Sequence, residues 1–169
     1  MKISPLILCA FAVLMSGCAS HPTSSASIKT YTLRLWGDAA PRLQMDLPSS
    51  FSMKRQRGAD FDVFYFIERS TQRDMGIYVG YYPGLLTREA GVADVQRQSG
   101  RVGDLSIEWL HWSKDGRHQS ETLVRDFFDQ STPKAHKPLV LHIFIGAPSA
   151  QDVARMEAAA ATLTLKRSR

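Results

Sequence analysis

The chain has 169 residues, and its 44% hydrophobic and 22% charged residues are typical of a folded globular protein, which argues against a disordered chain. The formal net charge is +5, but four of the cations lie near the ends of the chain, at Lys2, Lys166, Arg167 and Arg169. The body between these ends is therefore nearly neutral, which argues against nucleic-acid binding.

The N-terminal segment has the pattern of an export signal. Lys2 gives a short basic start, and residues 3–15 are apolar except for Ser4 and Pro5. This run of about 13 residues is shorter than the ~20 that a membrane-spanning helix needs, which disfavours an uncleaved anchor. We expect the segment to be removed, and a secretory peptide cut elsewhere is the alternative to a cut before Cys18.

The residues around the expected cut carry a family signature. The sequence LMSGC occupies residues 14–18 and resembles the lipobox of bacterial lipoproteins, although Met15 stands where leucine is more usual. The resemblance implies that the Cys18 sulfur takes a diacylglyceryl group and that the leader is cut just before this cysteine. In that family the new amino group is often acylated as well. Ala19 stands where an aspartate would resemble an inner-membrane retention signal in enteric-type bacteria. We therefore expect a lipid-anchored envelope protein at the periplasmic face of the outer membrane.

The chain divides into four parts. We predict a signal peptide over residues 1–17, the lipidated cysteine with a flexible tether over 18–27, a single globular domain over 28–166 and a basic tail over 167–169. The length is too short for two separate cores. Cys9, the only cysteine besides Cys18, lies in the leader, so the domain has no internal disulfide and no thiol for catalysis.

The first half of the domain is rich in strand patterns. Residues 31–36 and 43–47 alternate apolar and polar side chains, which predicts two half-buried strands. Residues 61–67 are almost wholly apolar and predict a central strand. A polar turn at 71–74 leads from it into a second aromatic strand over 76–82, and we expect these two strands to pair.

The second half of the domain contains a hairpin signal and a very apolar strand. The dipeptide at Asp115 and Gly116 favours a tight turn, so strands over 107–112 and 119–128 are predicted to form a long antiparallel hairpin. Residues 139–145 are hydrophobic on both sides of the predicted strand. We expect both faces of this strand to be covered.

Two helices are predicted. Residues 87–98 predict a short helix that Thr87 caps and Gly100 stops. Residues 149–163 have apolar side chains at helical spacing, with Ser149 or the proline before it at the start. The second helix is expected to pack on the sheet.

These elements predict an α+β fold, a mainly antiparallel curved sheet with the mid-chain helix and the C-terminal helix packed on its faces. Their order, with the sequence MDLP at residues 45–48 ending one strand, resembles the PsbP/Mog-type fold of small exported lipoproteins of the DcrB kind. The resemblance covers about residues 28–166. It implies a sandwich used as a binding or accessory module, and it brings no catalytic residues.

The sequence contains no pattern for a metal, cofactor or catalytic site, and we predict none of these. No phosphate loop, G-x-S-x-G elbow or Ser-x-x-Lys motif occurs. The five histidines lack metal-ligand spacing, and they are His21, His111, His118, His136 and His142. We expect His111 and His142, in predicted strands, to be hydrogen-bonded core or interface residues. A hydrolase would need one of them beside a carboxylate or serine in an open cleft.

Aromatic residues are the best candidates for a binding site, because tyrosine and tryptophan are enriched where a surface is half apolar and half wet. The candidate partner-binding residues are Trp36, Tyr78, Tyr81, Tyr82, Pro83 and Trp112. The turn that contains Tyr82 is the strongest of them, since aromatic residues on a turn are hard to bury. The alternative is that most of these rings fill the core.

Three functional hypotheses follow from the sequence. The first is a non-enzymatic binding or accessory module for another envelope or secreted protein, attached to the membrane through its N-terminal lipid. The second is an envelope hydrolase that acts on peptidoglycan or lipid. The third is a purely structural lipoprotein.

Overall fold

The computed structural model describes residues 27–35, 41–89, 91–128 and 139–166. The predicted leader, Cys18, almost all of the tether, Trp36 and the basic tail lie outside these described residues. Within the described ranges the chain is mostly antiparallel β-sheet with two helices, so the predicted α+β class is confirmed.

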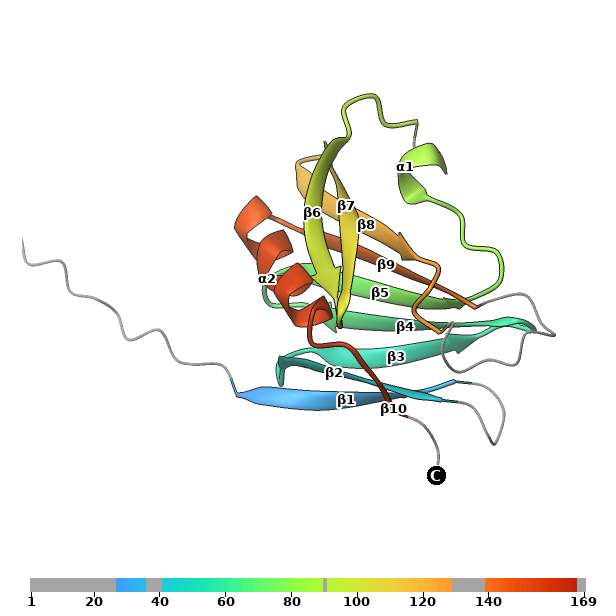
Figure 1. The fold of residues 1–169 in the computed structure, drawn as a ribbon. Helices are drawn as coiled ribbons and strands as arrows, with labels where there is room; N and C mark the ends of the chain where they lie inside the picture. Colours follow the sequence, from blue (N-terminus) through green and yellow to red (C-terminus); the bar gives the residue numbers. More distant parts are fainter. Residues whose placement is uncertain (1–26, 36–40, 90, 129–138, 167–169) are drawn as a thin grey trace, which may run out of the picture.

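The larger of two sheets has seven strands in the order β3-β4-β5-β9-β8-β7-β6 (Figure 1). Its strands are β3 (Ser52–Arg57), β4 (Phe61–Glu68), β5 (Arg73–Gly80), β6 (Gln96–Val102), β7 (Leu105–Lys114), β8 (Arg117–Val124) and β9 (Val140–Ala147). All six pairs of neighbouring strands in this sheet are antiparallel. The predicted pairing of the two aromatic strands, now β4 and β5, is confirmed.

The smaller sheet has three strands in the order β1-β2-β10 and lies against one face of the larger sheet. Its strands are β1 (Ile28–Arg34), β2 (Arg42–Pro48) and β10 (Thr164–Lys166). Leu33 and Leu43 are partners across β1 and β2, and both are fully buried. Tyr31 packs edge-on against Phe66 of β4, with ring centroids 5.3 Å apart. The two sheets therefore share one hydrophobic core.

The two faces of the larger sheet differ in composition. Ile77 and Ile143 pair across β5 and β9 and are fully buried on the core face. The opposite face carries aromatic rings, which we call the aromatic face: Phe61, Tyr65, Tyr78 and Phe144. Gly76 is needed there, because a Cβ at this position would lie 1.9 Å from the Phe144 ring. The sheet can carry a large ring on β9 only because β5 has no side chain beneath it.

The predicted hairpin is confirmed in β7 and β8, with Lys114 opposite Arg117. Asp115 and Gly116 have φ angles of 52° and 73°, the positive values that a type I′ hairpin turn requires. Strand β8 ends at Val124, earlier than the sequence predicts. Strand β9 is buried along almost its whole length, so the expectation that both of its faces are covered is also confirmed.

Helix α2 (Ala150–Ala160) confirms the predicted C-terminal helix. Ser149 caps it, since the Ser149 hydroxyl accepts a hydrogen bond from the backbone N–H of Asp152 at 3.1 Å. Val153 and Met156 are buried against the sheets. Neither helix of the described ranges is long and apolar enough to cross a membrane.

The predicted helix over residues 87–98 is wrong. Helix α1 (Leu86–Glu89) has only four residues, and the chain from Gln96 onward forms strand β6. Thr87 directs its hydroxyl to Glu121 of β8 and not to a following helical turn. Gly100 does not end a helix but lies beneath the ring of Trp109, where a Cβ would come within 2.4 Å of that ring. Contacts distant in sequence therefore override the local helical pattern.

Candidate functional site

The aromatic turn predicted from the sequence lies where β5 ends. Tyr78 stacks on Phe61 with ring centroids 5.5 Å apart, and its hydroxyl accepts a hydrogen bond from the backbone N–H of Tyr82 at 3.3 Å. Tyr82 is 67% exposed. Tyr81 is half-buried against the hydrophobic core, and Pro83 is half-buried as well. The turn is therefore held at both ends, while one large ring faces solvent.

The Tyr78 hydroxyl that holds this turn is neutral. Burial raises the pKa of Tyr78, and the nearby Asp60 carboxylate acts in the same direction, against the hydrogen bond from Tyr82. A tyrosine with a raised pKa keeps its proton throughout the physiological range. The contact at the turn therefore does not depend on pH near neutrality.

The segment after the aromatic turn is fixed to the sheet by a buried carboxylate. Glu121 is fully buried. One of its oxygens accepts hydrogen bonds from the backbone N–H of Thr87 at 2.8 Å and from the Thr87 hydroxyl at 2.6 Å. The other oxygen accepts from the backbone N–H of Leu86 at 2.8 Å and lies 2.8 Å from Nε2 of His142.

This arrangement decides the charge of Glu121. Burial alone would raise the pKa of Glu121, but the hydrogen bonds from His142, Thr87 and Leu86 together lower it. An ionised carboxylate at this place satisfies the first backbone N–H groups of α1. His142 is 3% exposed, so this pair is a structural anchor within the fold and not part of an open cleft.

Of the two candidate tryptophans, Trp36 lies outside the described residues and Trp112 lies away from the tyrosines. Trp112 is 5% exposed. The residue pairs across β7, β8, β9 and β5 put it in one row with Asp74 of β5, three strands away. Tyr78 lies four residues further along β5, so Trp112 and Tyr78 are roughly 20 Å apart at ordinary strand spacings. Trp109 is buried in the core. The structure thus gathers Tyr78, Tyr81, Tyr82 and Pro83 at one end of β5 but does not bring Trp112 to them.

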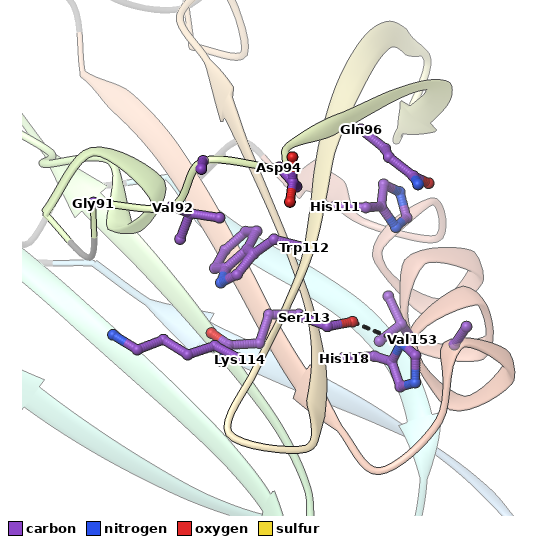
Figure 2. A pocket seen from close by; sticks show the side chains of 13 residues that line it. Gly91, Val92, Asp94, Gln96, His111, Trp112, Ser113, Lys114, His118 and Val153 are labelled. Atoms are coloured by element: carbon purple, nitrogen blue, oxygen red, sulfur yellow. Dashed lines mark hydrogen bonds between the residues drawn. The ribbon is translucent and has the colours of Figure 1, made fainter.

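A pocket of about 670 Å³ lies at the end of β7 that extends beyond β6. Pairing between the two strands stops at Gln96 and His111, so the last residues of β7 have the loop at 91–94 beside them. The start of α2 closes the other side with Ala150 and Val153. Figure 2 shows the Trp112 ring beside Val92 of this loop, with the His111 side chain on the other side of β7. The volume is in the range of pockets that hold small ligands.

The pocket contains a serine and a histidine in contact. The Ser113 hydroxyl and Nδ1 of His118 are 3.3 Å apart across the hairpin, as the dashed line in Figure 2 indicates. Asp94 and Lys114 add one carboxylate and one ammonium group to the lining. A hydroxyl beside an imidazole is the minimum arrangement for a nucleophile with a general base. Neither residue has a role predicted from the sequence, because the pocket around them also needs the loop at 91–94 and the start of α2.

His111 connects the pocket to a second carboxylate, that of Glu157, which is only partly exposed. Its Nε2 lies 3.2 Å from Oε1 of Glu157 in α2, and Ser120 of β8 is its strand partner. Burial raises the pKa of Glu157, although Ser120 and His111 favour its charged form. Ser120 is fully buried. A substrate has no access to that hydroxyl, so these three residues connect α2 to the sheet.

Two further observations bear on the site. Among residues 27–35, 41–89, 91–128 and 139–166, no three His, Cys, Asp or Glu side chains gather in a way that could hold a metal ion. Comparisons of the chain with protein-family models, with curated protein sequences and with solved structures gave no match. The geometry of the aromatic turn and of the pocket must therefore carry the functional conclusion.

Proposed function

We propose that this chain is a lipid-anchored protein of the cell envelope whose domain acts as a non-enzymatic binding or accessory module for another envelope or secreted protein. The observation that carries the proposal is the 67% exposure of Tyr82 on a turn whose backbone is fixed by Tyr78. The leader and the LMSGC sequence at residues 14–18 support the anchor, which would be on Cys18 at the periplasmic face of the outer membrane.

A fixed, exposed tyrosine suits protein recognition for a physical reason. Tyrosine is enriched among the residues that contribute most to binding, because its ring buries a large area and its hydroxyl still forms hydrogen bonds. A side chain on a turn that is already ordered loses little conformational freedom on binding. Tyr82 meets both conditions.

We also propose that the domain has the PsbP/Mog-type arrangement. The support is the order of the elements, with paired aromatic strands β4 and β5, the long β7–β8 hairpin, and the buried β9 followed by α2. This arrangement would be in keeping with an accessory role.

The first test is partner capture from detergent-solubilised envelopes. The lipidated wild-type chain should retain a partner, and Tyr82→Ala should lose it with unchanged thermal unfolding, because Tyr82 contributes little to the core. Met53→Ala is the matched control, since Met53 is also an exposed apolar side chain, at 42%, but lies at the other end of the domain. Equal capture by wild type and Tyr82→Ala would contradict a binding role for the turn.

A hydrolase acting on peptidoglycan or lipid is the second candidate, and the contact between Ser113 and His118 in the pocket favours it. A fluorophosphonate probe should then label wild type and fail to label Ser113→Ala and His118→Ala. Ser99→Ala, which removes an exposed serine from β6, is the control. An unlabelled wild type, together with Tyr82-dependent capture, would leave the binding module as the function.

A further inference from the structure

Most of the large apolar side chains that the domain exposes lie at one end. Of the four in the described ranges, Ile28 is 63%, Met53 42% and Ile67 39% exposed at this end, and Tyr82 lies at the other. Scattered exposed apolar residues are normal on protein surfaces. Apolar residues that gather in one place indicate an interaction surface.

Strand pairing brings these residues together. Ile28 opens β1 and pairs with Pro48, the last residue of β2. The backbone N–H of Ser49 donates to the carbonyl of Ser27 at 2.7 Å, which fixes the start of the domain against the turn into β3. Figure 1 shows the starts of β1 and β3 at the same end as the finish of β2 and β4.

The same end includes the open end of the β3–β4 hairpin. Ser52 and Ile67 are partners in the register, and Met53 follows directly in β3. Adjacent residues of a strand point to opposite faces, so Met53 and Ile67 present apolar groups on both sides of this end.

The charges at this end are mainly positive where they are exposed. Its exposed cations include Lys29, Lys54 and Arg69. Neither Lys54 nor Arg69 has an ion pair with another described residue. The acids nearby are already engaged, because Arg73 contacts both Glu68 and Asp152. The combination of apolar side chains and free cations suits the interface of an anionic bilayer.

The expected anchor also lies toward this end. Nine residues, 19–27, separate Cys18 from Ile28, and they reach at most about 30 Å. The chain enters the domain beside Ser49, so a lipid on Cys18 would hold this end, and not the end with Tyr82, near the bilayer.

We propose that this end, formed by Ile28, Met53 and Ile67 with Lys29, Lys54 and Arg69, docks on an anionic phospholipid bilayer. The inference rests on the lipid anchor of the proposed function and adds an orientation to it. Strand β5 runs from this end toward Tyr82 over eight residues, about 25 Å. Docking would therefore direct the aromatic turn away from the membrane, toward a partner.

The test uses the thiol content of the mature chain. Cys9 would leave with the leader and Cys18 would be lipidated, so an engineered cysteine is the single free thiol. Met53→Cys and Ile67→Cys, each labelled with an environment-sensitive fluorophore, are placed on vesicles of phosphatidylethanolamine and phosphatidylglycerol. Asp60→Cys is the matched control, because Asp60 lies in the turn at the far end of the same β3–β4 hairpin and is exposed.

The expected result is a shift of emission to shorter wavelength for the labels at 53 and 67 and none at 60. Charge reversal by Lys54→Glu with Arg69→Glu should reduce the shift on these vesicles. If the chain floats with the vesicles but the emission at all three positions stays that of a label in water, docking is overturned and the anchor is retained. A chain that does not float would overturn the anchor, and docking with it. Unchanged circular dichroism of each variant shows that the fold is retained.

Discussion

Two contacts between a histidine and a glutamate lie on opposite faces of the larger sheet and differ in how completely the carboxylate is satisfied. Glu121, on the aromatic face, accepts hydrogen bonds from Leu86 and Thr87 and contacts His142, and its pKa is lowered. Glu157, on the core face, lies 3.2 Å from His111, and its pKa is raised. Glu121 is fully buried and the Glu157 side chain is 11% exposed, yet the effect of burial on the pKa dominates only in Glu157.

The difference shows what determines the charge of a buried acid. Desolvation raises the pKa of both carboxyls, and the number and alignment of donors decide whether that effect is reversed. The backbone N–H groups of α1 supply donors to Glu121 that Glu157 lacks. We therefore expect acidification to remove the stability that the Glu121 carboxylate contributes. Protonation of Glu157 in acid should instead favour the folded state.

The largest effect is expected from Glu121→Ala. The change leaves the donors of Leu86, Thr87 and His142 buried without an acceptor, so the free energy of unfolding should fall by about 3–5 kcal/mol. Thermal unfolding and hydrogen exchange should show the loss, with faster exchange in the segment that contains α1. The loss should shrink in acid, because stability from a carboxyl with a lowered pKa is present above its ordinary value and lost as the pH falls through the native value.

An unchanged exchange rate around α1 in Glu121→Ala would contradict the role of Glu121 as an anchor. Glu121→Gln is the control for size, since it keeps one acceptor oxygen and should be intermediate. The comparison between alanine and glutamine separates the loss of packing from the loss of hydrogen bonds.

A smaller effect is expected from Thr87→Val, which keeps the shape and removes the hydroxyl that donates to Glu121 at 2.6 Å. The loss of a hydrogen bond to a charged group should lower the free energy of unfolding by about 2 kcal/mol. Urea unfolding followed by circular dichroism measures this loss. Thr87→Ser retains the hydroxyl and should remain close to wild type, and a serine variant as unstable as the valine variant would rule out this bond as the cause.

Much of the fold could be predicted from the sequence because the apolar residues of the inner strands already indicate that these strands are buried. Strands β4 and β9 are almost wholly apolar, and Asp115 with Gly116 specifies the turn between β7 and β8. Strands β3 and β6 were missed because both lie at the edges of the sheet and are mostly exposed and polar. Their conformation depends on their partners and not on an apolar pattern.

Of the two candidate sites, the sequence predicted the aromatic turn but not the pocket. The exposure of Tyr82 was predicted because a turn offers little cover to a ring. The pocket was missed, since its lining comes from the loop at 91–94, the hairpin of β7 and β8, and the start of α2. The predicted turn at Asp115 and Gly116 already sets Ser113 opposite His118, but the misassigned helix over 87–98 hid the loop at 91–94 that completes the pocket.

The smallest effect is expected from Glu157→Gln, which removes a charge that burial disfavours and keeps the size of the side chain. The free energy of unfolding at pH 7 should rise by less than about 1 kcal/mol, because His111 and Ser120 partly compensate the charge and the site is not sealed from water.

The sign follows from the raised pKa of Glu157, since the folded chain binds this proton more tightly than the unfolded chain. Wild type should therefore gain stability relative to Glu157→Gln as the pH falls through the native pKa toward the ordinary value of 4.5, and the advantage of the variant should vanish there. Urea unfolding at neutral and acid pH measures both ends of this range. A variant less stable than wild type at pH 7 would mean that His111 forms a net favourable ion pair with Glu157, and the contrast with Glu121 would then be one of degree and not of sign.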